Sequence, residues 1–198
     1  MKALVLSFFS LMALASLFGC RRSPAEIADA EVTDAEYRVL SAYIAGEFVG
    51  GEYVRQIVIF NETVSGTETP WGMYALNNVP GFETVHSRVY RAFLDANRHP
   101  VSFHRSFTLP VPYEIVASSE IHSIFGTPGN AWGRYYKKYP NSTGLLRLSR
   151  VGFDSHGNRA AFYVSNSCGG LCGDGYFVIM EKVDSNWKVV EDDHLWVS

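Results

Sequence analysis

Histidine and carboxylate side chains are the first candidates for acid–base catalysis, because they carry out most proton transfers in enzymes at neutral pH. The chain has six histidines. His104 precedes Arg105 and His122 follows Glu120 by two residues, so either position could supply an acid–base pair. No histidine lies in an H-E-x-x-H zinc motif, and no serine lies in a G-x-S-x-G turn. We therefore predict no catalytic residue, metal or cofactor, and a small hydrolase or isomerase with His104 or His122 as its base stays an alternative.

The N-terminal residues have the pattern of a secretory signal peptide. Lys2 gives a positive start, and residues 3–18 contain only Ala, Leu, Val, Phe, Met and Ser. This run is shorter than the ~20 apolar residues that a membrane-spanning helix needs. A positive start, an apolar run and a small residue before the cut are typical of a peptide that is removed on export.

Residues 17–20, Leu-Phe-Gly-Cys, resemble the lipobox of bacterial lipoproteins. The resemblance covers residues 1–20 and departs from the family at Phe18, where a small residue is usual. It implies cleavage before Cys20 and attachment of diacylglycerol to its thiol, with a further acyl chain, such as palmitate, on the new amine. Two acyl chains anchor a protein stably, whereas one binds marginally. In this family an Asp after the cysteine favours the inner membrane, so Arg21 implies the outer membrane of a Gram-negative cell.

These features predict three parts of the chain. Residues 1–19 are the signal peptide, residues 20–32 a lipidated tether, and residues 33–198 a single globular domain. The tether is small, polar and rich in alanine, which suits a flexible spacer.

Cys168 and Cys172 are the two thiols that remain once Cys20 is lipidated. In an oxidising envelope compartment they are expected to form a small structural disulfide, and the neighbouring glycines make the tight turn sterically cheap. A thiol–disulfide redox protein is an alternative, but the C-x₃-C spacing differs from the C-x-x-C motif at a helix start. A zinc site would need two further ligands, which only His156 or His194 could bring through the fold.

Several aromatic residues lie in or near loop-like sequence and could line an apolar pocket, or simply fill the core. The residues we expect at such a pocket are Trp71, Tyr74, His104, His122, Trp132 and Tyr135.

Hydrophobic spacing predicts the elements that must position these residues. Thr33 and Glu36 fit a capping box before a helix that ends at Gly50 and Gly51. A second helix is expected after Thr84 as cap and is ended by Asn97. Two short helices are expected after Ser118 as cap, closed by Gly126, and after Asn130 as cap, with Trp132, Tyr135 and Tyr136 inside. Strands are expected at 55–63, 113–117, 145–154, 159–167, 176–183 and 187–197.

Helices before a run of strands joined by short turns predict an α+β fold. We expect N-terminal and central helices packed on one face of a curved antiparallel sheet that ends in a four-stranded meander. Apolar residues change from even to odd numbers between Leu148 and Val151, which predicts a β-bulge near Arg150.

The segment from Leu148 to Trp196 resembles a C-terminal region of uncharacterised bacterial secreted proteins. The residues that carry the resemblance are Ser149-Arg150-Val151-Gly152-Phe153, the glycine-rich stretch around Cys168 and Cys172, and Trp187-Lys188-Val189. The resemblance implies a shared fold and no activity.

The net charge of the chain excludes one class of function. The formal charge is −3, which argues against a general nucleic-acid binder. Together with the lipobox, these features predict a lipid-anchored cell-envelope protein whose domain binds a partner protein or a small molecule without catalysis.

Overall fold

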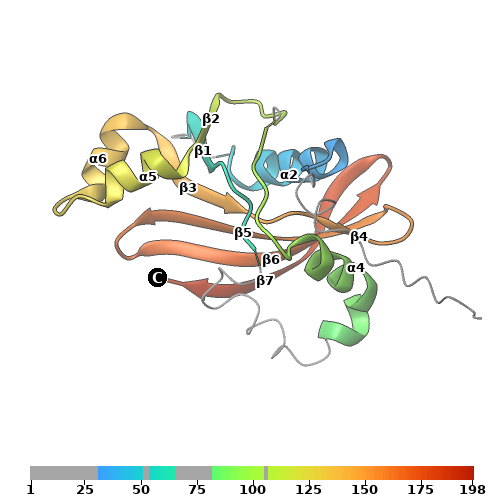
Figure 1. Cartoon of the computed structure of the whole chain (residues 1–198). Helices are drawn as coiled ribbons and strands as arrows, with labels where there is room; N and C mark the ends of the chain where they lie inside the picture. The colour runs from blue at the N-terminus through green and yellow to red at the C-terminus, as the bar shows by residue number, and fades with distance from the viewer. Residues whose placement is uncertain (1–30, 51–53, 66–81, 105–106) are drawn as a thin grey trace, which may run out of the picture. The chain divides into compact units, whose positions relative to one another are not determined.

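The computed structural model describes residues 31–50, 54–65, 82–104 and 107–198, and these belong to one unit, Glu31–Ser198 (Figure 1). They form an α+β fold of helices and one mixed sheet of seven strands that is not closed, which confirms the predicted class. The described helices are α2 (Asp34–Glu47), α4 (Phe82–Ala96), α5 (Ser118–Phe125) and α6 (Ala131–Lys138). The strands are β1 (Gln56–Phe60), β2 (Tyr113–Val116), β3 (Ser142–Leu148), β4 (Gly152–Phe153), β5 (Arg159–Gly169), β6 (Cys172–Val183) and β7 (Asn186–Val197).

The sheet is mixed, so the prediction that it is antiparallel throughout was wrong. Its order is β2-β1-β3-β5-β6-β7, and β4 pairs with β5. β1 pairs in parallel with both β2 and β3, whereas the pairs β3–β5, β5–β6 and β6–β7 are antiparallel. Long crossover connections that contain helices precede β2 and β3, and such crossovers return the chain in the same direction.

The expected strand over 145–154 is divided into β3 and β4 by an irregularity at residues 149–151. Leu148 is paired with Val164, and Gly152 is paired with Ala161. The chain therefore advances four residues on one strand and three on the other, which is a one-residue bulge. This is the register change predicted near Arg150, and it exchanges the faces of the sheet to which even and odd residues point.

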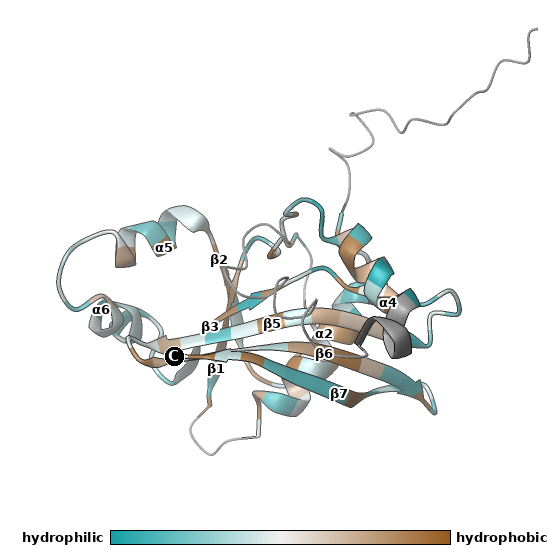
Figure 2. Ribbon diagram, turned by 90° about the horizontal axis from the view of Figure 1, so that it is seen from below, coloured by the Kyte–Doolittle hydropathy of each residue, from teal (hydrophilic) through white to brown (hydrophobic). Residues whose placement is uncertain are grey.

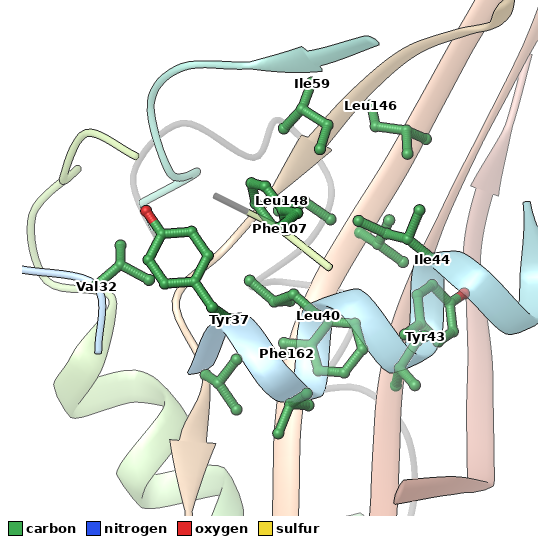
Figure 3. Close-up of a cluster of buried hydrophobic side chains, with 14 of the residues drawn as sticks. Val32, Tyr37, Leu40, Tyr43, Ile44, Ile59, Phe107, Leu146, Leu148 and Phe162 are labelled. Atoms are coloured by element: carbon green, nitrogen blue, oxygen red, sulfur yellow. The ribbon is translucent and has the colours of Figure 1, made fainter. Parts of the chain in front are cut away.

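Helix α2 covers one face of the sheet. Its buried residues Tyr37, Leu40, Tyr43 and Ile44 contact side chains that alternate along the strands (Figure 3). The strand residues in this cluster include Ile57, Ile59, Leu146, Leu148, Ala160, Phe162, Val164, Val178 and Met180. These residues occupy every second position of their strands, so their side chains lie on one face of the sheet and those between them lie on the other.

Helix α4 packs against the other set, so the prediction that the helices share one face was wrong. Val89, Tyr90 and Phe93 of α4 pack with Ala161, Tyr163, Phe177 and Ile179. Residues 160–164 of β5 are all buried, which requires cover on both faces. Helices α5 and α6 form a third cluster with Val58, Phe60 and Leu145, which lie on the α4 face by the same alternation.

The helix ends follow the sequence signals in most cases. Thr33 and Glu36 form the predicted capping box, and the Asn130 side chain accepts a hydrogen bond from the Gly133 N–H at 2.7 Å. Ser118 is not the cap of α5, because Ala117 occupies that position without a side-chain hydrogen bond. The prediction placed the cap one residue too late.

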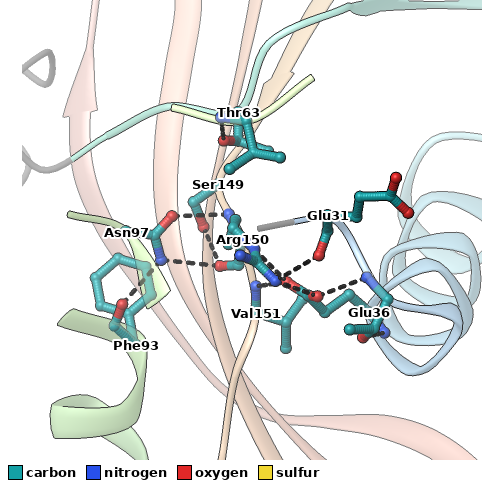
Figure 4. A network of polar contacts seen from close by, with 10 residues as sticks. Glu31, Glu36, Thr63, Phe93, Asn97, Ser149, Arg150 and Val151 are labelled. Atoms are coloured by element: carbon teal, nitrogen blue, oxygen red, sulfur yellow. Dashed lines mark hydrogen bonds and ion pairs between the residues drawn. The ribbon is translucent and has the colours of Figure 1, made fainter. Parts of the chain in front are cut away.

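A buried polar network joins α2, α4 and the bulge (Figure 4). The Arg150 guanidinium donates to both carboxylate oxygens of Glu36, at 3.0 and 2.8 Å, and to the Glu31 carbonyl at 2.9 Å. The Asn97 side chain, just after α4, bonds the Arg150 backbone N–H at 2.8 Å and carbonyl at 3.0 Å. The Val151 N–H donates to Glu36 at 3.1 Å. The network therefore satisfies the backbone groups that the bulge removes from the sheet ladder.

None of the helices within the described ranges is long and apolar enough to cross a bilayer.

Candidate functional site

Arg147 lies on the α4 face of the sheet, between the side-chain cluster of α4 and that of α5 and α6. It follows Leu146 and precedes Leu148, both of which point to the α2 face, so its own side chain lies on the opposite face. Its guanidinium carbon is 4.8 Å from the centre of the Phe60 ring, a cation–π contact across from β3 to β1. The guanidinium is thereby held over an aromatic surface.

The charge of Arg147 is not balanced by a carboxylate in the described part of the chain. The ion pairs there join other residues, and the Nε donor of Arg147 is buried without a hydrogen-bond partner. A guanidinium stays protonated at all relevant pH values. Buried donors that lack partners cost free energy, and in native proteins such a donor calls for an explanation.

Hydroxyl groups on β5 lie beside this cation. Ser165 is directly opposite Arg147 in the antiparallel pair, which places their Cβ atoms about 4.5–5.5 Å apart on one face. Tyr163, two residues earlier, points to the same face, and its hydroxyl accepts a 2.8 Å hydrogen bond from the Trp196 indole N–H. Tyr163 and Ser165 are each 6% exposed. We call Arg147, Tyr163, Ser165 and Trp196 the Arg147 strip.

Trp196 is fixed over this strip by a glycine. A Cβ atom on Gly175 would overlap the Trp196 indole nitrogen, so only glycine allows the ring to lie there. Gly175 on β6 is paired with Ser165 on β5 and with Trp196 on β7. Residues of these three strands therefore lie side by side at the Arg147 strip.

The residues predicted for a pocket are only partly brought together. Trp132 and Tyr135 lie side by side on α6, with ring centres 5.2 Å apart, and they pack against Phe125 and the core. Burial raises the pKa of the Tyr135 hydroxyl well above its usual value. Trp71 and Tyr74 lie outside the described residues.

The two histidines of that prediction lie in separate places. His104 is exposed, and its backbone N–H donates to the Tyr37 hydroxyl at 2.9 Å. His122 is exposed on α5. Glu120 contacts Lys138 and Tyr139 on α6, and hydrogen bonds from these two groups hold the pKa of Glu120 below its usual value. Residues two apart on a helix do not face each other, so this sequence pair does not form an acid–base pair on α5.

Cys168 and Cys172 are bonded to each other at the end of the β5–β6 hairpin. Their Cα atoms are 5.0 Å apart, within the usual range for a disulfide. The Tyr136 hydroxyl on α6 donates to the Cys168 carbonyl at 2.8 Å, which ties the hairpin end to that helix. The thiols are therefore not available as zinc ligands in this state. Cys20 lies outside the described residues.

A second group of titratable residues lies on the α2 face near the edge strand β7, which carries a hydrophilic stretch (Figure 2). The rings of Tyr176 and His194 are stacked with centres 4.6 Å apart. Burial, and then the charges of Asp174 and Asp192, raise the pKa of Tyr176. In the described residues no group of histidine, cysteine and carboxylate side chains has the arrangement of a metal site.

Comparison of the chain with protein-family models, with curated proteins and with solved structures finds no match. The candidate site therefore stands on its own geometry.

The sequence analysis did not single out the Arg147 strip. The one local signal is the pattern Leu-Leu-Arg-Leu over 145–148, in which a charged residue interrupts an apolar strand. A lone arginine in such a pattern usually points to solvent, and only the fold places Phe60 and Ser165 on either side of it.

Proposed function

We propose that this chain is a lipid-anchored protein of the bacterial cell envelope whose folded domain binds a ligand and does not catalyse a reaction. The anchor is the diacylglyceryl group on Cys20, with Arg21 after it directing the protein to the outer membrane where the cell has one. The Arg147 strip is the binding site, and the observation that carries the binding function is the uncompensated guanidinium at its centre.

The disulfide supports the proposed location. Disulfides persist in oxidising compartments such as the periplasm and the cell surface, and they are rare in the cytosol. The two cysteines that remain after lipidation are the two that are bonded to each other.

The position of Glu31 supports a tethered arrangement. Its carbonyl is held by Arg150 at the bulge, opposite the middle of β5, whereas the disulfide lies at the far end of the same strand. A strand rises about 3.3 Å per residue, so the two places are separated by roughly 20–25 Å along β5. In our proposal the tether joins the folded domain at the bulge, and β3, β5, β6 and β7 form the curved antiparallel meander.

The anchor is tested by intact-mass analysis of the protein purified from membranes of a bacterial host. The expected species begins at Cys20 and carries the mass of a diacylglyceryl group, and Cys20→Ser yields a protein without lipid that leaves the membrane fraction. The matched control is the double variant Cys168→Ser/Cys172→Ser, which should keep the lipid. An unmodified Cys20 in the wild-type protein would overturn the proposed location.

A further inference from the structure

The Arg147 strip presents hydrogen-bond donors of the kind that bind negatively charged oxygen atoms. Arg147 offers a planar fork of N–H groups, which matches the two oxygens of a carboxylate or phosphate. The Tyr163 hydroxyl already accepts a hydrogen bond from Trp196, so its own proton is left to donate. No hydrogen bond of the Ser165 side chain is formed within the described residues, and Ser165 lies directly across from Arg147.

We propose that Arg147, together with the hydroxyls of Tyr163 and Ser165, binds the anionic oxygen group of a small ligand, a carboxylate or a phosphate. This inference rests on the proposed binding function and specifies the ligand chemistry of the same site. The ligand's charge compensates the guanidinium, which has the Phe60 ring on one side and Ser165 on the other.

The surroundings favour an anion over a cation or a neutral ligand. Asp193 is a carboxylate on the same face of the sheet, in register with Phe177 and two strands away from Tyr163. None of the ion pairs between described residues joins a carboxylate to Arg147. The low exposure of Tyr163 and Ser165 lowers the local dielectric constant, which strengthens a charge-assisted hydrogen bond. A bidentate arginine contact also selects for planar, paired oxygen acceptors.

The simplest rival is that Arg147 only covers Phe60 with its alkyl stem and guanidinium plane. In that case its charge has no ligand, and a neutral residue of similar length would serve equally well. The two explanations differ in anion binding, which is directly measurable.

The test is a titration of the mature lipidated protein, purified in detergent, with inorganic phosphate and separately with acetate. The readout is the ¹⁵N–¹H NMR signal of the Trp196 indole, because this N–H donates to the Tyr163 hydroxyl. We expect a saturable shift with a Kd at or below about 1 mM for at least one of the two anions. Arg147→Gln should weaken binding at least tenfold, which is the effect of losing a charged hydrogen-bond partner.

Two further variants separate charge from geometry. Arg147→Lys keeps the charge but loses the fork, so it should bind with intermediate affinity, and it serves if Arg147→Gln fails to fold. Arg159→Gln, which removes a half-exposed guanidinium paired with Glu181, is the matched control and should bind as the wild type does. Saturation by phosphate alone or by acetate alone supports the proposal and names the source of the oxygen group.

Absence of a saturable shift with both anions, or equal affinity of the wild type and Arg147→Gln, would overturn the inference. That result would leave the lipid anchor untouched, because the anchor is decided by the mass of Cys20. If the protein carries no lipid but still binds phosphate through Arg147, the proposed location is wrong and the proposed ligand chemistry is correct.

Discussion

Arg150 and Glu36 form a buried ion pair, and the fold depends on this pair more than on any single ion pair at the surface. The Arg150 side chain is 13% exposed and its partner Glu36 only 3%. Burial alone would raise the pKa of Glu36, but the hydrogen bond from Arg150, the backbone N–H groups of Thr33 and Val151 and the charge of Arg150 together hold it below its usual value. A buried carboxylate that remains ionised depends on all of these donors.

Removing Arg150 should therefore be severe. We expect Arg150→Ala to lower the free energy of unfolding by about 3–5 kcal/mol, because it leaves the Glu36 charge buried without its partner. Chemical denaturation followed by circular dichroism measures the change. The matched control is Arg159→Ala, which removes a half-exposed partner of Glu181 and should cost no more than about 1 kcal/mol. Equal losses in the two variants would contradict the role assigned to Arg150.

Glu36 should also make stability depend on pH. A carboxylate whose pKa is lower in the folded state stabilises the protein above its unfolded pKa, and this contribution is lost as the pH falls through the folded value. The usual value is 4.5, so the stability difference between wild type and Glu36→Gln should shrink below that pH. Denaturation curves of both proteins between about pH 6 and pH 2 test this. A difference that does not change with pH would show that the pKa of Glu36 is the same in the folded and unfolded states, which contradicts the lowered value.

The sequence predicts one of the two roles of Glu36. Its position three residues after Thr33 identifies the capping box, which is a local pattern, and the structure confirms it. The contact with Arg150 joins residues 114 positions apart, and no local pattern carries that information. The same is true of Arg147, whose neighbours Phe60 and Ser165 come from other strands.

Among the packed elements, α4 lies in direct backbone contact with β4. A Cβ atom on Gly152 would overlap backbone atoms of Ala92 and Phe93 in α4. The bulge turns this residue toward α4, and a glycine lets the helix lie directly on the strand. Side chains cannot absorb such an overlap, because the atoms in the way are backbone.

We expect Gly152→Ala to destabilise the protein by at least about 1–3 kcal/mol, the usual cost of overpacking. The matched control is Gly46→Ala in α2, where no atom lies within 4 Å of the added Cβ. That change should stabilise the protein by up to about 1 kcal/mol, because alanine favours a helix over glycine. Thermal unfolding of the two variants gives the comparison, and a tolerated Gly152→Ala would mean that α4 can shift.

Most elements could be predicted from local patterns, whereas their partners could not. Asn130 and Gly126 mark helix ends as expected. β5 and β7 have nearly the predicted bounds, whereas β6 begins at Cys172, earlier than the predicted residue 176. The run Ile57–Phe60 is buried on both faces, a pattern typical of parallel strands. The burial of this strand could be predicted from the sequence. Its parallel pairing could not, because the direction of its partners depends on the crossover connections that follow.

For the whole molecule, the unit Glu31–Ser198 contains its own core. Val32 belongs to that core and is only 4% exposed, and the Glu31 carbonyl accepts a hydrogen bond from the Arg150 guanidinium. Both residues therefore contact the folded unit, although they precede the capping box at Thr33. Short segments next to a helix give little sequence signal, because one apolar residue does not define a pattern.

A chain that begins at residue 31 should unfold at the same temperature as the mature protein. A chain that begins at residue 34 loses the packing of Val32 and the cap of Thr33, and we expect it to be less stable by about 2–4 kcal/mol. Differential scanning calorimetry of the three proteins measures both effects. Equal stability of the two truncated chains would show that residues 31–33 do not support the fold.

The position of β1 between β2 and β3 has a consequence for how the chain folds. β1 pairs with residues 113–116 on one side and 142–146 on the other, so both partners are made long after it. Pairings over such sequence distances form slowly. Until then an uncharged run of β-branched and aromatic residues is exposed, and such runs associate readily with one another. Before β2 and β3 have formed, aggregation of this chain is therefore expected to begin at β1.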